Sequence, residues 1–94
     1  MEMPQVSKCS ASDCAYNTDM NCHALAITIG DTADPHCDTF FSGSAKGGSP
    51  NDIGRVGACK VSVCKHNEHL ECQASSIEVG KRDGGVYCMT FSFG

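Results

Sequence analysis

Apolar and polar residues alternate along this chain only in short stretches. In residues 27–30, Ile27 and Ile29 flank a threonine, and in residues 77–80, Ile77 and Val79 flank a glutamate. Side chains of a strand point alternately to its two faces, so both stretches predict half-buried strands that end at a glycine. No segment of ten residues has the periodicity of an amphipathic helix.

A further predicted strand lies on either side of each of these stretches. Residues 6–9 form a short extended segment, with a counterpart at residues 56–59. Residues 36–40 and 87–91 place a cysteine and a threonine on one face of a last strand and a phenylalanine on the other. The predicted fold class is therefore small and β-rich with little helix, and each half of the chain is a short antiparallel three-stranded sheet.

The two halves are tandem copies of one four-cysteine unit. The cysteines of the first half are separated by four, seven and fourteen residues, and those of the second by four, seven and fifteen. Twelve positions are identical when residues 6–41 are aligned with residues 56–92. Such a repeat decides the architecture before any propensity argument. The two sets are Cys9, Cys14, Cys22 and Cys37, and Cys59, Cys64, Cys72 and Cys88.

The repeated pattern also carries a family resemblance. It reads Cys-x4-Cys-x-Tyr/His-Asn-x4-Cys-x-Ala-x-x-Ile-x-Ile/Val-Gly and closes with Cys-x-Thr-Phe. This pattern resembles the small bacterial cysteine-rich domain known as domain-of-unknown-function family 1540, often found in pairs, over roughly four-fifths of the chain. The second copy departs at Lys65 and His66 and by one inserted residue before Cys88. The resemblance implies the repeat boundaries and a bacterial origin, and no activity.

The duplication divides the chain into three regions. We expect a first four-cysteine metal-binding unit in residues 1–41, a Gly/Ser-rich linker in residues 42–55, and a second unit in residues 56–94. The linker contains four glycines and a proline. A flexible segment of this length spans about 20 Å, so the units are free to move independently unless their strands pair across the duplication.

Each unit is too small to fold on its apolar core alone. It has about thirty-six residues, below the roughly 40 at which cross-links or metals usually become necessary. The four cysteines must therefore supply stabilisation, either as two disulfides or as one metal cage per unit. Residues 1–7 lack the basic and apolar segments of a secretory signal, so we expect a cytoplasmic protein with reduced thiols. A mature chain that has lost its signal would look the same, which keeps a disulfide-stabilised secreted domain as an alternative.

Reduced thiols in sets of four predict zinc, two ions per chain, with all eight cysteines as ligands. Zinc commonly closes a structural site with four thiolates. Neither unit contains Cys-x-x-Cys, the spacing typical of zinc ribbons, and iron or copper is an alternative soft-ligand partner. The histidines do not align between the copies, so we expect them on the surface rather than in a site common to both. They are His23, His36, His66 and His69.

Charge and chemistry narrow the function. The formal net charge is −4, which argues against nucleic acid and anionic membranes as partners. The repeats share no nucleophile beside a base and no carboxylate pair, so catalysis and a small-molecule substrate are not expected. The predicted function is a non-catalytic metal-binding protein with two structural zinc sites, acting as an interaction or regulatory module toward another protein. The alternatives are metal handling and redox sensing through the thiolates.

Overall fold

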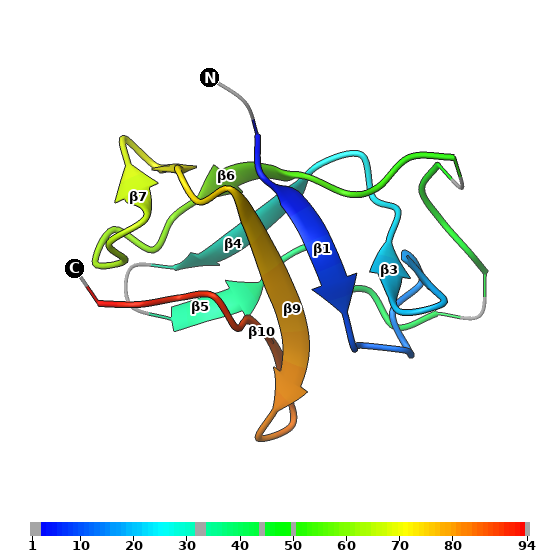
Figure 1. Cartoon of the computed structure of the whole chain (residues 1–94). Helices are drawn as coiled ribbons and strands as arrows, with labels where there is room; N and C mark the ends of the chain where they lie inside the picture. Colours follow the sequence, from blue (N-terminus) through cyan, green and yellow to red (C-terminus); the bar gives the residue numbers. More distant parts are fainter. Residues whose placement is uncertain (1–2, 32–33, 44, 50, 94) are drawn as a thin grey trace.

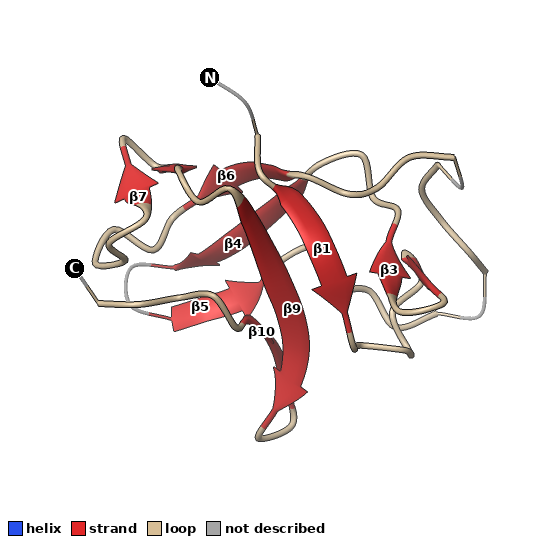
Figure 2. Cartoon of the chain, in the orientation of Figure 1, coloured by secondary structure: helices blue, strands red, loops and turns tan. Residues whose placement is uncertain are grey.

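A computed structural model describes residues 3–31, 34–43, 45–49 and 51–93. Within these ranges the chain forms strands and no helix (Figures 1 and 2). No helix among the described residues is therefore of a length and apolarity to cross a bilayer. The strands are β1 (Gln5–Cys9), β2 (Asn17–Thr18), β3 (Asn21–Cys22), β4 (Ile27–Asp31), β5 (Asp34–Cys37), β6 (Val56–Cys59), β7 (Asn67–Glu68), β8 (Glu71–Cys72), β9 (Ser76–Arg82) and β10 (Gly85–Cys88).

Six of these strands form one mixed sheet in the order β1-β9-β10-β5-β4-β6. β4 pairs antiparallel with β5, and β9 antiparallel with β10, as the sequence predicts for the last two strands of each copy. The two hairpins join through Tyr87 and His36 on β10 and β5. The fold is thus small and β-rich, and its main sheet spans both copies.

The first strand of each copy pairs with the other copy. β1 lies parallel to β9, with Val6 opposite Ile77, and β6 lies parallel to β4, with Val56 opposite Ile27 (Figure 1). The prediction of a separate three-stranded antiparallel sheet in each copy is therefore wrong. The shared apolar pattern of the repeats explains the error, because Val6 can meet an isoleucine at the equivalent position of β4 or of β9.

The exchanged strands also close the sheet on itself. The backbone N–H of Val6 donates to the Gly54 carbonyl (2.8 Å), and that of Val56 donates to the Pro4 carbonyl (2.9 Å). An antiparallel bridge between Gln5 and Arg55 lies between these bonds. The strands thus pair across the duplication, so the two units do not move independently.

The core lies between the two copies and draws equivalent residues from each. The largest fully buried side chains are Val6, Ile27, Ile29, Val56, Val61 and Ile77. Six of the eight cysteines are buried in the same cluster. Fully burying a Val or Ile side chain is worth about 1.5–3 kcal/mol, so the exchange gives one shared core in place of two that would each be too small.

Two small hairpins flank the main sheet, β2–β3 in the first copy and β7–β8 in the second. Each turns through two residues with positive φ, Asp19 and Met20 (53° and 67°) or His69 and Leu70 (55° and 65°). This backbone matches the right-handed twist of a two-residue hairpin. The side-chain amide of Asn17 donates to the Cys9 carbonyl at 2.7 Å and ties the first hairpin to β1; Asn67 and Cys59 repeat the bond at the same distance.

Candidate metal centres

The four cysteines of the first copy line one small cavity, of about 10 Å³. Cys9 ends β1, Cys22 ends β3 and Cys37 ends β5, while Cys14 lies in the turn-rich segment between β1 and β2. Three strand ends and one turn therefore bring together the thiols that the sequence grouped. The remaining wall is apolar apart from Tyr16 and Thr39.

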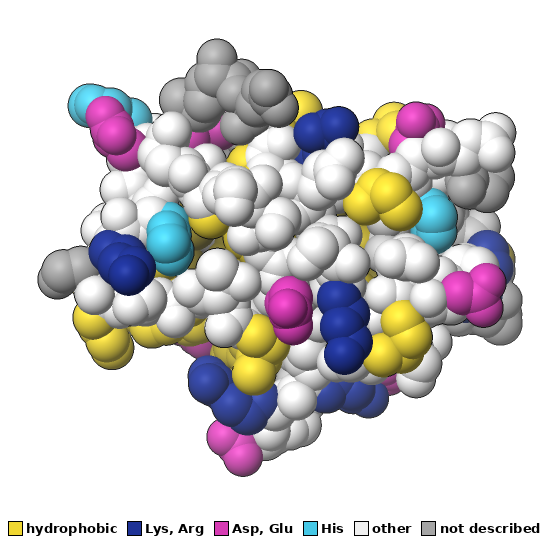
Figure 3. All heavy atoms as spheres, viewed as in Figure 1, with side chains coloured by type: hydrophobic (Ala, Val, Ile, Leu, Met, Phe, Trp, Pro, Cys, Tyr) yellow, Lys and Arg dark blue, Asp and Glu magenta, His cyan; other side chains and the backbone are white. Residues whose placement is uncertain are grey.

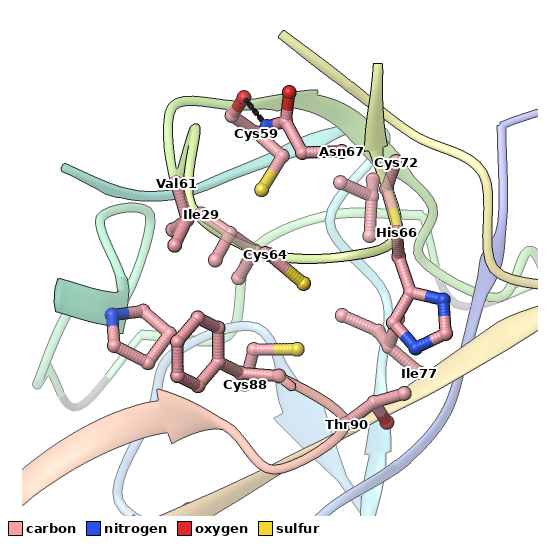
Figure 4. A pocket seen from close by; sticks show the side chains of 13 residues that line it. Ile29, Cys59, Val61, Cys64, His66, Asn67, Cys72, Ile77, Cys88 and Thr90 are labelled. Carbon is pink, nitrogen blue, oxygen red and sulfur yellow. Dashed lines mark hydrogen bonds between the residues drawn. The ribbon is translucent and has the colours of Figure 1, made fainter. Parts of the chain in front are cut away.

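The second copy repeats this arrangement around a cavity of about 20 Å³. Cys59, Cys64, Cys72 and Cys88 line it, with Cys59 on one side and Cys88 opposite in Figure 4. No Asp, Glu, Lys or Arg of the described residues lines either cavity. Sulfur is thus the dominant donor in both.

Each cavity is completed by residues of the other copy, which sequence reasoning missed. Val79 and Val86 of the second copy line the first cavity, and Ile29 and Pro35 of the first copy line the second. These are equivalent positions in the repeat, because Val79 corresponds to Ile29 and Val86 to Pro35. Strand exchange is the cause, since β1 and β6 carry Cys9 and Cys59 onto the other copy's sheet. The cysteine sets are separate, whereas the walls are shared.

Burial and backbone N–H groups act in opposite directions on the thiols. Burial raises the pKa of Cys37 to about 11 and that of Cys88 to about 11. The backbone N–H groups of Thr39 and Phe40 favour the Cys37 thiolate and lower its pKa, as those of Thr90 and Phe91 do for Cys88. Burial is the larger effect, so both thiols are neutral at pH 7 unless a cation takes the place of the proton.

Cys22 and Cys72 lie in the same kind of environment. Burial raises the pKa of each thiol, and a backbone hydrogen bond from Ala24 or Ala74 opposes the shift. Charge on the first two cysteines of the same set raises both pKa values further. The thiols of one set are therefore near enough to interact electrostatically. In both sets, backbone N–H groups donate hydrogen bonds to equivalent sulfurs.

The threonines beside the last cysteines bind backbone. The backbone N–H of Thr28 donates to the Thr39 hydroxyl oxygen, and that of Glu78 donates to the Thr90 hydroxyl, each at 3.0 Å. Both threonines also line a cavity. Each hydroxyl thus fixes the segment after the last cysteine against the adjacent strand, β4 or β9.

One of the histidines lines a cavity. His66 is half-buried and lines the second cavity, where the first cavity has Tyr16 (Figure 4). The carbonyl of His66 accepts a 2.7 Å bond from Gln73, next to Cys72, which brings its ring to the cavity wall. His23 instead contacts the Asp52 carbonyl through Nδ1 (2.7 Å), and His36 lies beside Asp34 and Asp38. The alignment of His66 with a tyrosine was the available signal, since both are rings at one position.

The four thiols of each set line one cavity, but they do not lie close enough together to form a metal-ligand cluster. All eight cysteines lie in the described part of the chain, and all are free thiols. Among the described residues, no group of three or more Cys, His, Asp or Glu is drawn together closely enough to hold a metal ion as it stands. The donor set of each cavity nevertheless fits a soft, four-coordinate cation, because it consists of four thiols with N–H donors behind them.

Comparison with known proteins gives a family. No curated protein and no solved structure matches the chain. The family described as Domain of Unknown Function (DUF1540) matches residues 8–40 and 58–91. These segments hold all eight cysteines and cover more than half of the sequence. The chain therefore belongs to this family, in two tandem copies.

Proposed function

We propose that this protein is a non-catalytic metal-binding module with two structural zinc sites, one in each four-cysteine cavity. The observation that carries the proposal is that the four thiols of each repeat line one cavity, and that neither cavity includes a thiol of the other repeat. Cys9, Cys14, Cys22 and Cys37 would hold one ion, and Cys59, Cys64, Cys72 and Cys88 the other. Iron or copper would meet the same donors.

The chemistry of the cavity walls supports a structural role. When bound, zinc supplies a closed cross-link among four thiolates and, as structural zinc, an apparent binding free energy of about 10–16 kcal/mol. Backbone N–H groups at Cys22, Cys37, Cys72 and Cys88 stabilise negative charge on sulfur. Apolar side chains line most of each cavity wall, and no carboxylate among the described residues lines either cavity as a general base.

Burial favours structure over metal handling. Six of the cysteines are buried, and the other two are half-buried. Ligands that water and competing thiols cannot reach exchange slowly, so a buffer or a peroxide sensor would need more exposed sulfur. We place the protein in the reducing cytoplasm of a bacterium, where the thiols stay reduced, as an interaction or regulatory module whose partner is another protein.

The test is metal content together with thiol count. Protein purified under reducing conditions without added metal should contain near two zinc ions and eight titratable thiols per chain. Chelator should then convert dispersed amide resonances to those of a disordered chain. Dispersion that survives complete metal removal would overturn the structural-zinc proposal, and an absence of both metal and free thiols would mean disulfides.

A further inference from the structure

The linker (residues 42–55) lies against the first four-cysteine unit. Its described residues 45–49 and 51–54, which we call the strap, run beside β3 (Figure 1). Three backbone N–H groups of the strap donate to carbonyls of the unit: Gly47 to Ala15 (2.9 Å), Ser49 to His23 (2.9 Å) and Gly54 to Cys22 (2.6 Å). The strap therefore has a fixed path along the β2–β3 hairpin.

Local contacts hold the strap in place. The ammonium of Lys46 donates to the Asn17 carbonyl at 2.7 Å. The Ser49 hydroxyl donates to the Asp52 carboxylate (2.8 Å), and the Asp52 N–H donates to the Ser49 carbonyl (3.1 Å), which closes a turn. On the face drawn in Figure 3, basic and acidic side chains are interspersed. Individual hydrogen bonds, rather than a surface of one charge, thus fix the strap.

The strap packs from outside on two residues that line the first cavity. Gly47 lies against the ring of Tyr16, and a Cβ on Gly47 would stand 3.0 Å from a ring carbon. Gly54 lies against Cys22, and a Cβ there would stand 2.7 Å from the sulfur. Both contacts leave little room for a side chain. The backbone of the strap is therefore an outer layer over this part of the cavity.

Between these two contacts the strap braces a hydrogen-bond donor to sulfur. Gly48 has a φ of 82°, and a Cβ on it would clash with the His23 carbonyl and lie 3.1 Å from the Ala24 nitrogen. Burial raises the pKa of Cys22, and the backbone hydrogen bond from Ala24 opposes that shift. Lifting the strap would therefore free the segment that stabilises negative charge on this sulfur.

The strap is less firmly held than the sheet beside it. Gly54 is buried and Ser49 half-buried, whereas the other described strap residues are exposed. Segments with exposed hydrogen bonds and few buried apolar contacts open at a lower free energy than the core. The carbonyl of Gly54 also accepts the N–H of Val6 on β1, which is fully buried. Gly54 is thus the point from which the strap can lift while the sheet stays closed.

We propose that the linker is a strap over the first metal site, and that its local opening is the step that exposes Cys22 to incoming soft ligands such as small thiols and chelators. Lifting from Tyr16 and His23 loosens the cavity wall and the Ala24 donor while β1 and β6 stay paired. This inference rests on the proposed metal-binding function and names the element that regulates ligand exchange at the first site.

The first test measures metal exchange in the full zinc-loaded chain. Added cadmium, a soft divalent cation, replaces zinc while the sites stay filled, and the amide resonances of Cys22 and Cys72 report the two sites separately. Gly48→Ala should raise the exchange rate at Cys22 at least about tenfold, the factor that corresponds to about 1.4 kcal/mol, and leave the rate at Cys72 unchanged. An unchanged rate at Cys22, or equal acceleration at both sites, would overturn the strap.

Gly84→Ala is the matched control. Gly84 has a φ of 81°, close to that of Gly48, but apart from its chain neighbours no atom of the described residues lies within 4 Å of a Cβ placed there. This variant carries the same backbone strain without pressing on a neighbour, so both exchange rates should equal those of the parent chain. Acceleration at Cys22 equal to that in Gly48→Ala would refute the role of the strap contacts.

Lys46→Met decides the question if Gly48→Ala loses its dispersed amide signals. It removes the ammonium that donates to the Asn17 carbonyl and keeps the aliphatic stem. Exchange at Cys22 should rise by about threefold, as expected for loss of one hydrogen bond of ordinary net strength, with the rate at Cys72 unchanged. No change at Cys22 in a folded Lys46→Met chain would contradict the proposal.

Hydrogen exchange in the parent chain tests the opening itself. The amide hydrogens of Gly47 and Ser49 should exchange at similar rates, and both faster than that of Val56, whose bond to the Pro4 carbonyl helps to close the sheet. One common rate for all three would mean that the strap opens only when the chain unfolds, and the strap proposal would fail.

Zinc content of the same samples separates these outcomes from failure of the metal sites. In a zinc-loaded chain, unaltered exchange in the variants refutes the strap alone. A metal-free chain with reduced thiols would refute the metal proposal, and the rate at which Cys22 reacts with iodoacetamide would then replace cadmium exchange. That rate should be higher in Gly48→Ala than in the parent chain, with Cys72 unaffected, and equal rates would overturn the strap.

Discussion

The two cavities hold the same sulfur set and differ in what surrounds it. Tyr16 lines the first and His66 the second. Residues 1–41 carry one basic and six acidic residues, a formal charge of −5, whereas residues 56–94 carry four of each. Lys81 of the second copy reaches Asp13 of the first at 3.1 Å and lowers the pKa of that carboxyl, chiefly through their hydrogen bond. The duplicated fold thus fixes the cysteines and leaves their surroundings free to change.

The shared cavity walls couple the two sites. The differences in charge and in the ring at the cavity wall would let each site lose metal or unfold separately, whereas Ile29 and Val79 link each cavity to a strand of the other copy. Experiments can measure whether the two sites behave separately or together, and the one with the largest expected effect comes first.

Replacing one of the proposed zinc ligands should disrupt both copies. Cys22→Ser leaves three thiols in the first cavity, and loss of its metal should release β1 and β4 and with them the wall of the second cavity. We expect collapse of dispersed amide signals in both copies and loss of both metals. Cys72→Ser is the matched variant and should behave alike. Retention of one tightly held ion with intact Ile77 resonances would mean that the halves are independent.

Acid should release both metals in one step. Burial raises the thiol pKa values of Cys37 and Cys88 equally, to about 11. Because the pKa values of these thiols are raised in the folded protein, both thiols hold their protons across pH 5–8. A metal ion must displace these protons, so metal affinity falls as the pH falls, by about tenfold per pH unit for each proton displaced. The Ile27 and Ile77 resonances should therefore disappear together in an acid titration. Earlier loss at Ile27, with a gap that narrows in high salt, would show that the −5 charge outweighs the shared walls.

Trimming a wall residue should weaken the cavity of the opposite copy. Ile29→Ala removes a 2% exposed side chain and should cost about 2–5 kcal/mol, the range for such core truncations. Zinc affinity should fall more at the second cavity than at the first, as measured by competition with a chelator of known affinity. Val79→Ala is the reciprocal variant, and Val63→Ala, at an exposed position, is the control. A loss confined to the first cavity after Ile29→Ala would contradict the shared-wall description.

Exchanging the rim residues should have the smallest effect. Tyr16→His and His66→Tyr make the two rims alike, and because the proposed ligands are the four thiols, stability should change by less than about 1 kcal/mol. Cobalt substituted for zinc should give the same thiolate charge-transfer intensity in both variants and in the parent chain. A fall in that intensity in Tyr16→His, or a rise in His66→Tyr, would show that the imidazole displaces a thiolate.

Much of the local structure was readable from the sequence. The alternation around Ile27 and Ile77 became β4 and β9, and the spacing of the cysteines grouped them correctly around two cavities. These features depend on residues close in sequence or on the repeat itself. The place of His66 on a cavity wall was not predicted, because a half-buried ring there has no periodic signature.

The pairing of β1 was out of reach for a different reason. Val6 and Val56 are identical, and so are Ile27 and Ile77, so the pattern is equally satisfied by pairing within a copy or between copies. Only the three-dimensional path of residues 10–26 and 60–75 decides between them. The docking of the linker was equally hidden, since its glycines read as flexibility although Gly47 and Gly48 are required for close contact with Tyr16 and His23.

Strand exchange has a consequence for the order of events during synthesis. The Ser7 hydroxyl donates to the Ile77 carbonyl, 70 positions later, so β1 leaves the ribosome long before the strand it joins exists. At about 5–20 residues per second the wait lasts several seconds, during which β1, Cys9 and the first hairpin have no complete sheet. The nascent chain therefore exposes an unpaired strand and reactive thiols until its second copy emerges, and its yield should depend on the redox state and chaperone capacity of the cell that makes it.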